Sequence, residues 1–359
     1  MRRLLITGAA GFIGANFVHY WIKKYPSDRV IALDALTYAG NLRNLEPAQR
    51  HPTFDFVKGD IGNFELVEDI LFGKQIDTIV HFAAESHVDR SIVGPDAFIE
   101  TNIVGTHCLL KAAHRVWIQR HKIPVPHRFH HISTDEVYGS LSPTGSPFTE
   151  ASCFSPNSPY AASKASADHL VRAYFKTLGL QVTTTNCSNN YGPYQFPEKL
   201  IPLVITNILL GKPLPVYGDG QNVRDWLHVS DHCRGIDLVL RRGKPGDTYN
   251  IGGRCEQKNI DIVNAICGIV DDMFSLSHEL HDRFPKSPAK SGASASLIQF
   301  VNDRPGHDRR YAVNMTKIFD QLAFDPIRTW ELGLEETIQW YIDNEDWWQS
   351  ILDGTYRDL

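Results

Sequence analysis

A glycine-rich turn near the start of the chain constrains the fold most. The segment TGAAGFIG, Thr7–Gly14, follows the apolar run Leu4–Ile6 and opens a helical stretch near Ile13–Lys24. Its G-x-x-G-x-x-G spacing allows a tight turn and brings backbone N–H groups to a pyrophosphate at a helix N-terminus. Asp34 stands 20 positions beyond Gly14, where a carboxylate binds ribose hydroxyls and repels a 2′-phosphate. The pattern predicts NAD rather than NADP; the alternative is a purely structural turn.

Short apolar runs alternate with helical stretches through the first half of the chain. Strands joined by helical crossovers predict a parallel sheet buried on both faces. The expected fold class is α/β, a Rossmann-type doubly wound parallel sheet with a smaller mixed α/β lobe toward the C-terminus. We expect strands at Leu4–Ile6, Val30–Leu33, Phe54–Val57, Thr78–Phe82, Phe129–Ser133, Val182–Asn186 and Thr248–Ile251, and a helical pattern at Trp226–Arg241.

Prolines interrupt this alternation after about Asn189 and indicate a second lobe. We expect a cofactor domain of residues 1–188 plus about 225–252, and a second domain of about 189–224 plus 253–359. The segment Pro285–Ala295 is rich in Ser, Pro and Lys, which predicts a mobile surface loop.

Composition excludes several classes of protein. Lys and Arg number 36 against 41 Asp and Glu, whereas nucleic-acid binders usually carry a basic surplus. The 6 cysteines form no C-x-x-C pair and most of the 16 histidines are scattered, so we expect no metal. No apolar run reaches the roughly 18 residues of a membrane span, and no signal-peptide pattern opens the chain. We expect a cytoplasmic protein with neither nucleic-acid nor membrane partners.

A tyrosine and a lysine share one predicted helical face. Ser158 and Pro159 form a good helix start, and Tyr160 and Lys164 follow four residues apart. A neighbouring ammonium and a positive nicotinamide ring lower the pKa of a tyrosine, so Tyr160 is a candidate base. The alternative is a surface helix pair.

Three polar residues follow the strand predicted at Phe129–Ser133. Thr134, Asp135 and Glu136 place a hydroxyl and two carboxylates beyond a strand end. Hydride transfer needs only a hydroxyl and a tyrosine, so the two extra acids suggest further proton transfers, one as acid and one as base. The alternative is a pair of solvated turn carboxylates.

Eight motifs spread over nearly the whole chain resemble the extended short-chain dehydrogenase/reductase superfamily and, within it, the dTDP-glucose 4,6-dehydratases. Sugar-nucleotide epimerases of this fold lack the paired acids after the threonine. The motifs are TGAAGFIG (Thr7–Gly14), DALTYAGN (Asp34–Asn41), AAESHVDRSI (Ala83–Ile92), STDEVYG (Ser133–Gly139), PYAASKA (Pro159–Ala165), NCSNNYGPYQFPEKLIP (Asn186–Pro202), YGDGQNVRDWLHV (Tyr217–Val229) and DRPGHDRRYA (Asp303–Ala312).

The resemblance implies a redox-neutral lyase reaction with tightly bound NAD. In the oxidation at carbon 4 of the glucose, Tyr160 would act as base on the hydroxyl, and Lys164 would orient Tyr160. Thr134 would form a hydrogen bond with the oxygen of that hydroxyl. Glu136 would remove the hydrogen on carbon 5 while Asp135 protonates the leaving hydroxyl on carbon 6. Hydride return to carbon 6 gives dTDP-4-dehydro-6-deoxy-glucose plus water, a step of deoxysugar (dTDP-rhamnose type) biosynthesis.

The resemblance also implies two binding sets, helped by the rule that ligands lie beyond the carboxyl ends of the strands. The arginines of the second set suit a diphosphate, although a salt bridge from Arg224 to Asp219 or Asp225 is an alternative. The cofactor set is Gly8, Gly11, Phe12, Ile13, Gly14, Asp34, Leu36, Thr37, Asp60, Ile61, Phe82, Ala83, Ala84, Ser86, Thr101, Ser133, Tyr160, Lys164 and Asn190. The substrate set is Ser86, Thr134, Asn189, Glu198, Lys199, Leu200, Tyr217, Arg224, Asn259, Arg304 and His307.

Three departures from the family stand out. Ala35 replaces the usual lysine, Phe284–Ala295 is longer than usual, and Leu359 precedes the usual tyrosine-bearing tail, for which Tyr356 is an uncertain substitute.

The resemblance implies a homodimer through the helices near Thr101–Val116 and Tyr160–Lys176; the sequence itself shows only apolar helical faces there, which fit core packing equally well. The nearest alternative function is a sugar-nucleotide epimerase or decarboxylase of the same fold, which leaves carbon 6 unchanged. A non-catalytic scaffold is a second alternative.

Overall fold

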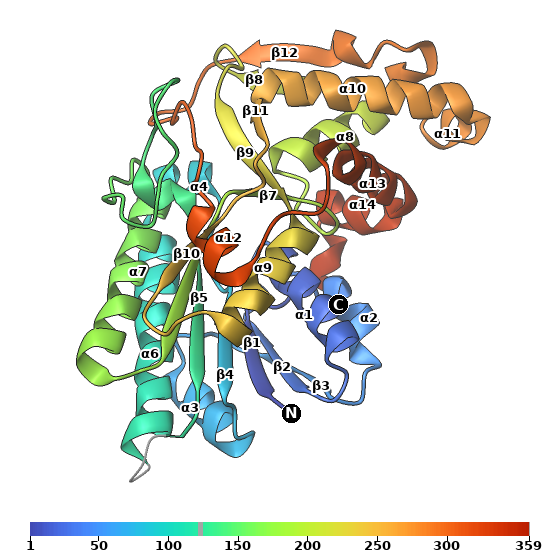
Figure 1. Cartoon of the computed structure of the whole chain (residues 1–359). Helices are drawn as coiled ribbons and strands as arrows, with labels where there is room; N and C mark the ends of the chain where they lie inside the picture. Colours follow the sequence, from blue (N-terminus) through green and yellow to red (C-terminus); the bar gives the residue numbers. More distant parts are fainter. Residues whose placement is uncertain (121–124, 359) are drawn as a thin grey trace.

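A seven-stranded sheet organises the larger of two lobes (Figure 1). The computed structural model describes residues 1–120 and 125–358. All neighbouring strands of this sheet run parallel, in the order β10-β6-β5-β4-β1-β2-β3. This confirms the predicted doubly wound α/β class. The strands are β1 (Arg3–Thr7), β2 (Arg29–Asp34), β3 (Phe54–Lys58), β4 (Thr78–His81), β5 (Arg128–Thr134), β6 (Val182–Cys187) and β10 (Thr248–Ile251).

Helices cover both faces of this sheet (Figure 1). On one face lie α1 (Phe12–Lys24) and α9 (Val229–Arg242), and on the other α3 (Phe64–Gly73), α6 (Thr106–His114) and α7 (Pro159–Leu178). Alternate residues of a strand point to opposite faces, so Leu4 and Ile6 enter one core and Leu5 the other. Burial on both sides explains the apolar runs of β1 and β2.

Shorter segments connect these elements. They are η1 (Leu42–Leu45), α2 (Glu46–Gln49), α4 (Val88–Val93), α5 (Asp96–Phe98), η2 (Ile99–Gly105), η3 (Arg115–Gln119), η4 (Asp135–Tyr138) and α12 (Thr316–Leu322).

The smaller lobe combines two small sheets with helices around its own apolar core. One sheet has the order β11-β9-β7 and the other pairs β12 with β8. The strands are β7 (Asn189–Tyr191), β8 (Leu214–Tyr217), β9 (Val223–His228), β11 (Glu256–Lys258) and β12 (Ile298–Val301). The helical segments are α8 (Leu200–Leu210), α10 (Asn259–Leu276), α11 (His278–Arg283), η5 (Pro288–Ser291), η6 (Ser294–Leu297), α13 (Trp330–Asp343), α14 (Glu345–Asp353) and η7 (Thr355–Asp358).

Two predictions about local structure were wrong. The helical pattern assigned to Trp226–Arg241 begins inside β9, and α9 starts only at Val229. Trp226 and Leu227 are both buried, so this strand lacks the alternation that marks a half-exposed strand. The predicted mobile loop at Pro285–Ala295 contains η5 and the start of η6. Ser294 is buried and donates a hydrogen bond to Asp271 of α10. Because this bond satisfies its hydroxyl, the polar side chain does not need to contact solvent.

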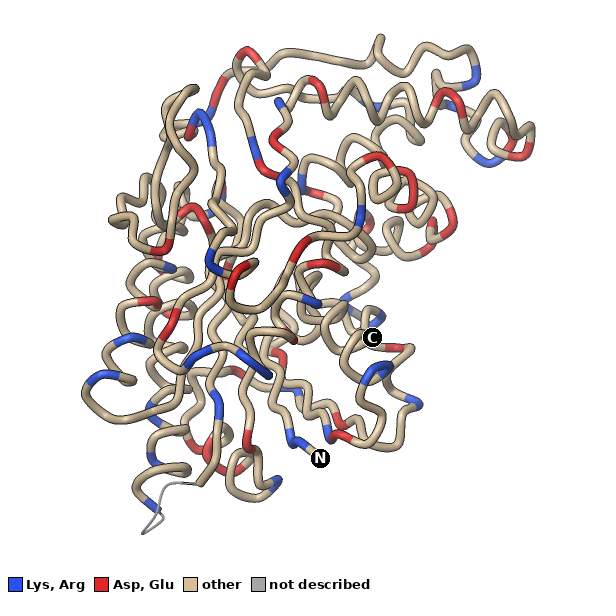
Figure 2. The backbone as a smooth tube through the Cα atoms, in the orientation of Figure 1, with Lys and Arg blue, Asp and Glu red and all other residues tan. Residues whose placement is uncertain are grey.

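The strand order opens a crevice at the carboxyl ends of β1 and β4. Because β1 lies between β2 and β4, the crossovers leave it in opposite directions, and ligands of open α/β sheets bind at such a point. Acidic and basic residues are interspersed over both lobes (Figure 2). No helix among residues 1–120 and 125–358 is both long and apolar enough to cross a membrane.

Candidate active site

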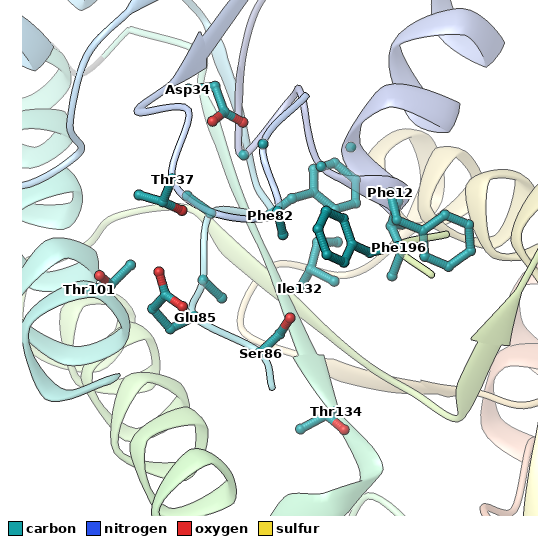
Figure 3. Close-up of a pocket in the computed structure, with 18 of the residues that line it drawn as sticks. Phe12, Asp34, Thr37, Phe82, Glu85, Ser86, Thr101, Ile132, Thr134 and Phe196 are labelled. Carbon is teal, nitrogen blue, oxygen red and sulfur yellow. The ribbon is translucent and has the colours of Figure 1, made fainter. Parts of the chain in front are cut away.

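A pocket opens along this crevice and extends to the smaller lobe. Figure 3 shows Asp34 and Thr134 far apart in the pocket, with Phe82, Ile132 and Ser86 between them. Nearly the whole predicted cofactor set lines it. These residues are Gly8, Gly11, Phe12, Ile13, Gly14, Asp34, Thr37, Asp60, Ile61, Phe82, Ala83, Ala84, Ser86, Thr101, Ser133, Tyr160, Lys164 and Asn190.

The glycine turn after β1 leaves no room for side chains at two positions. Gly8 has a φ of +66°, and a Cβ added there meets the backbone N of Ala83 at 2.5 Å. A Cβ on Gly14 meets the carbonyl oxygen of Gly8 at 2.2 Å. Both positions therefore require glycine. Without side chains there, the turn packs directly against the end of β4, and α1 packs directly against the turn.

Asp34, at the end of β2, is fixed by the turn that it faces. Its Oδ2 accepts the Ala10 N–H and its Oδ1 accepts the Leu36 N–H, both at 2.8 Å. Leu36, the one predicted cofactor residue outside the lining, acts here through its backbone. Burial raises the pKa of Asp34, and the two backbone hydrogen bonds act in the opposite direction. A glycine cradle facing a held carboxylate fits NAD.

Two adjacent carboxyl groups follow β5 in different surroundings. Asp135 is 1% exposed, and one of its oxygens, Oδ2, has no hydrogen-bond partner. Burial, followed by the neighbouring Glu136 and Asp225 carboxylates, raises the pKa of Asp135 well above its usual value. These surroundings favour the protonated form of Asp135.

Glu136 lines the pocket, and three cations act on it. Burial raises the pKa of Glu136, while Arg224, Arg304 and Lys199 act in the opposite direction. For Asp135, the Arg224 charge lowers the pKa, whereas the Glu136 and Asp225 charges raise it. The surroundings therefore favour a protonated Asp135 beside an ionised Glu136, the arrangement required of an acid and a base.

The helix α7 presents Tyr160 and Lys164 to the pocket as predicted. Ser158 caps the helix by accepting the Ala161 N–H at 3.1 Å, and Lys164 donates to the Ile132 carbonyl at 2.7 Å. The expected lowering of the pKa of Tyr160 by Lys164 is not observed. Burial, followed by the Glu136 carboxylate, instead raises the pKa of Tyr160 well above its usual value.

The predicted substrate set divides into two parts. Ser86, Thr134, Asn189, Glu198 and Lys199 line the pocket. The remainder lies outside its lining: Leu200, Tyr217, Arg224, Asn259, Arg304 and His307.

Arg224 makes neither of the salt bridges weighed above. It donates to the Asp308 carbonyl at 2.9 Å and stacks over the Tyr311 ring, whereas Asp219 pairs with Arg309. Arg304 pairs with Asp89 at 3.2 Å.

Several pocket residues were absent from the predicted sets. Nine of them lie in motifs quoted above, so motif membership was the available signal: Cys187, Ser188, Gln195 and Phe196 in NCSNNYGPYQFPEKLIP, Ala35, Tyr38, Ala39 and Gly40 in DALTYAGN, and Glu85 in AAESHVDRSI. The full group is Leu33, Ala35, Tyr38, Ala39, Gly40, Gly59, Glu85, Ile132, Cys187, Ser188, Gln195 and Phe196. Within the described parts of the chain, no group of His, Cys, Asp and Glu side chains is arranged to hold a metal.

Comparisons with known proteins place this chain among relatives of known activity. The family model for GDP-mannose 4,6 dehydratase matches residues 5–337. The chain is 53% identical to a dTDP-glucose 4,6-dehydratase of Xanthomonas campestris pv. campestris, covering 99% of this chain and 98% of the relative.

Two crystal structures that contain NAD share the fold. One is the dTDP-glucose 4,6-dehydratase DesIV of Streptomyces venezuelae, with a TM-score of 0.85 and 47% identity over 97% of this chain and 99% of that one. The other is the dTDP-glucose 4,6-dehydratase of Bacillus anthracis, with a TM-score of 0.83 and 46% identity over 98% of this chain and 100% of that one.

Proposed function

Since this chain belongs to the dTDP-glucose 4,6-dehydratase family, we propose that the side chains following β5 and opening α7 carry out its reaction in the pocket described above. The protein is a hydro-lyase with tightly bound NAD. It converts dTDP-glucose to dTDP-4-dehydro-6-deoxy-glucose and water, a reaction of deoxysugar biosynthesis of the dTDP-rhamnose type. The observation that carries the assignment of roles is the contrast between the surroundings of Asp135 and Glu136.

The first proposed step is proton removal from the hydroxyl on carbon 4. Tyr160 takes this proton, Thr134 donates a hydrogen bond to the same oxygen, and Lys164 orients the tyrosine. Tyr160 starts with a raised pKa, so the positive charge of the oxidised cofactor is needed to favour its phenolate. Bound NAD accepts a hydride from carbon 4 and returns it to carbon 6.

The second proposed step is elimination across carbons 5 and 6. The ketone at carbon 4 acidifies the hydrogen on carbon 5, and the ionised Glu136 removes it. Asp135 donates its proton to the leaving hydroxyl on carbon 6, which departs as water. The burial that keeps Asp135 protonated is what suits it to this role.

We assign the glycine turn and Asp34 to the adenosine and pyrophosphate of NAD. Arg224 and Arg304 are assigned to the substrate diphosphate, which requires each guanidinium to turn from its present partner. The lobe boundaries that we propose are residues 1–188 plus about 225–252 for NAD, and about 189–224 plus 253–359 for the nucleotide sugar. The return of the chain to add β10 to the large sheet supports this division.

We propose a cytoplasmic homodimer. All six cysteines are unpaired, which suits a reducing compartment.

Apolar side chains are exposed on the segments beside α6 and α7, among them Val93, Ile99 and Val104. Exposed apolar side chains on these segments favour association with a second copy. Light scattering at micromolar concentration is expected to give the dimer mass; a monomer contradicts the proposal.

Product identification tests the proposed function. Incubation with dTDP-glucose is expected to give a product lighter by one water, whereas an epimerase leaves the mass unchanged. A parallel incubation with UDP-glucose measures nucleotide preference. Unchanged mass with dTDP-glucose contradicts the assignment.

A further inference from the structure

The end of the chain packs against the loop that forms the adenosine side of the NAD pocket. α14 and η7 contribute Trp347, Trp348 and Tyr356 to the core of the smaller lobe. Yet the C-terminus lies beside α1 and α2 of the NAD lobe (Figure 1). The loop between β2 and η1, residues 35–41, lies in this contact, and most of it lines the pocket.

A series of hydrogen bonds runs from α14 to the ribose-binding carboxylate. Trp347 donates its indole N–H to Asn44 Oδ1 at 2.8 Å, and Asn44 donates Nδ2–H to the Ala10 carbonyl at 2.8 Å. The Ala10 N–H in turn donates to Asp34. Trp347 is 5% and Asn44 2% exposed, so the loss of one partner leaves a buried polar group unsatisfied.

A second contact, from η7, reaches the loop of residues 35–41 directly. The Tyr356 hydroxyl donates a hydrogen bond to the carbonyl of Tyr38. The Tyr356 ring also contacts the Phe196 ring edge to face, with ring centroids 6.1 Å apart. Tyr38 and Phe196 both line the pocket and also contact each other, with ring centroids 5.7 Å apart. The C-terminal segment therefore holds the pocket wall at two separate points.

We propose that Trp347 and Tyr356 are positioning residues that keep the loop of residues 35–41 closed over the adenosine end of NAD and thereby slow NAD release. The reaction regenerates its cofactor in every turnover, so the enzyme completes successive turnovers without exchanging NAD. A wall held in its bound conformation also lowers the entropic cost of binding. The inference rests on the NAD pocket of the proposed function.

The chain offers a matched pair of variants to test this role. Trp347 and Trp348 are adjacent and buried, and each donates one indole hydrogen bond at 2.8 Å. Trp348 donates to the Tyr341 carbonyl of α13, which is not part of the loop of residues 35–41. Trp347→Phe and Trp348→Phe therefore each remove one buried bond, and thermal denaturation checks that they are equally stable.

The measurement is the rate at which NAD leaves the purified holoenzyme, followed by filtration and an assay of the free nucleotide. Trp347→Phe is expected to release NAD about tenfold faster than wild type, as the loss of one buried hydrogen bond predicts, and Trp348→Phe at the wild-type rate. Tyr356→Phe keeps its ring on Phe196, and it is also expected to accelerate release.

Equal release rates in the two tryptophan variants overturn the positioning role. If wild-type protein contains no NAD and binds none when it is added, the proposed function itself is wrong. Normal NAD content in wild type with equal release from both variants leaves the proposed function intact and rejects only the present inference.

Discussion

Single residues in this site differ in their titration because they differ in their neighbours. Asp135 and Glu136 are consecutive, but one is enclosed and beside carboxylates while the other faces arginines and a lysine. The motif identified both residues, but the contrast in surroundings depends on Arg224, Arg304 and Lys199, which are distant in sequence.

Glu136→Gln is expected to lower turnover by about 10²- to 10⁴-fold, because the amide cannot remove the hydrogen on carbon 5. NAD content is expected to stay at the wild-type level, since Glu136 makes no contact with the glycine turn. Steady-state rates and the nucleotide content of the purified variant check both statements. A wild-type rate contradicts the assignment of Glu136 as base.

The pH dependence of kcat reports the same pair of groups. The base must be ionised, so the rate falls as the pH drops through the raised pKa of Glu136. The acid must be protonated, so the rate falls as the pH rises through the raised pKa of Asp135. The expected profile is a bell whose limbs belong to the coupled pair.

Asp135→Asn is expected to lower the rate and to flatten the alkaline limb, because its amide does not titrate. A pH titration of kcat for this variant beside wild type checks the assignment. An alkaline limb that persists unchanged in the variant contradicts the role of Asp135 as proton donor.

At the scale of elements, the glycine turn couples β1, β4 and α1. Gly8→Ala is expected to destabilise the protein by about 1–3 kcal/mol and to reduce NAD content, because the new Cβ meets Ala83 at a positive φ. Gly268→Ala, in α10, is the matched control: its Cβ has no neighbour within 4 Å.

The control is expected to gain about 0.5–1 kcal/mol from its helical position. Calorimetry of both variants, with nucleotide content measured in parallel, separates backbone strain from the general effect of replacing a glycine. Equal behaviour of the two variants contradicts the close packing of Gly8.

Sequence patterns predicted the central sheet well because its strands are buried on both faces. The run Thr248–Ile251 was located at its observed bounds. Prediction failed at Trp226–His228, where a buried strand runs directly into a helix. It also failed at Ser294, whose polar side chain is satisfied by a residue of another element. Long-range hydrogen bonds of this kind leave no local pattern.

The same reasoning explains which pocket residues were missed. Gly8, Asp34 and Tyr160 stand at fixed spacings within one crossover unit or one helix turn, so spacing predicts them. Phe196 reaches the pocket from the loop between β7 and α8, on the other side of the crevice. Its place depends on how the two lobes meet, which no local spacing encodes.

For the whole molecule, we propose that a single pocket between two lobes performs an oxidation, an elimination and a reduction with no net redox change. The hydride removed from carbon 4 must therefore reappear on carbon 6 of the same sugar. An epimerase of the same fold returns it to carbon 4.

Isotopic labelling tests this claim most directly. With dTDP-glucose carrying deuterium at carbon 4, we expect a product lighter by one water that carries the deuterium at carbon 6, with no accumulation of NADH. Mass spectrometry and NMR of the product locate the label. Deuterium that stays at carbon 4, or that remains on accumulated NADH, contradicts this reaction course.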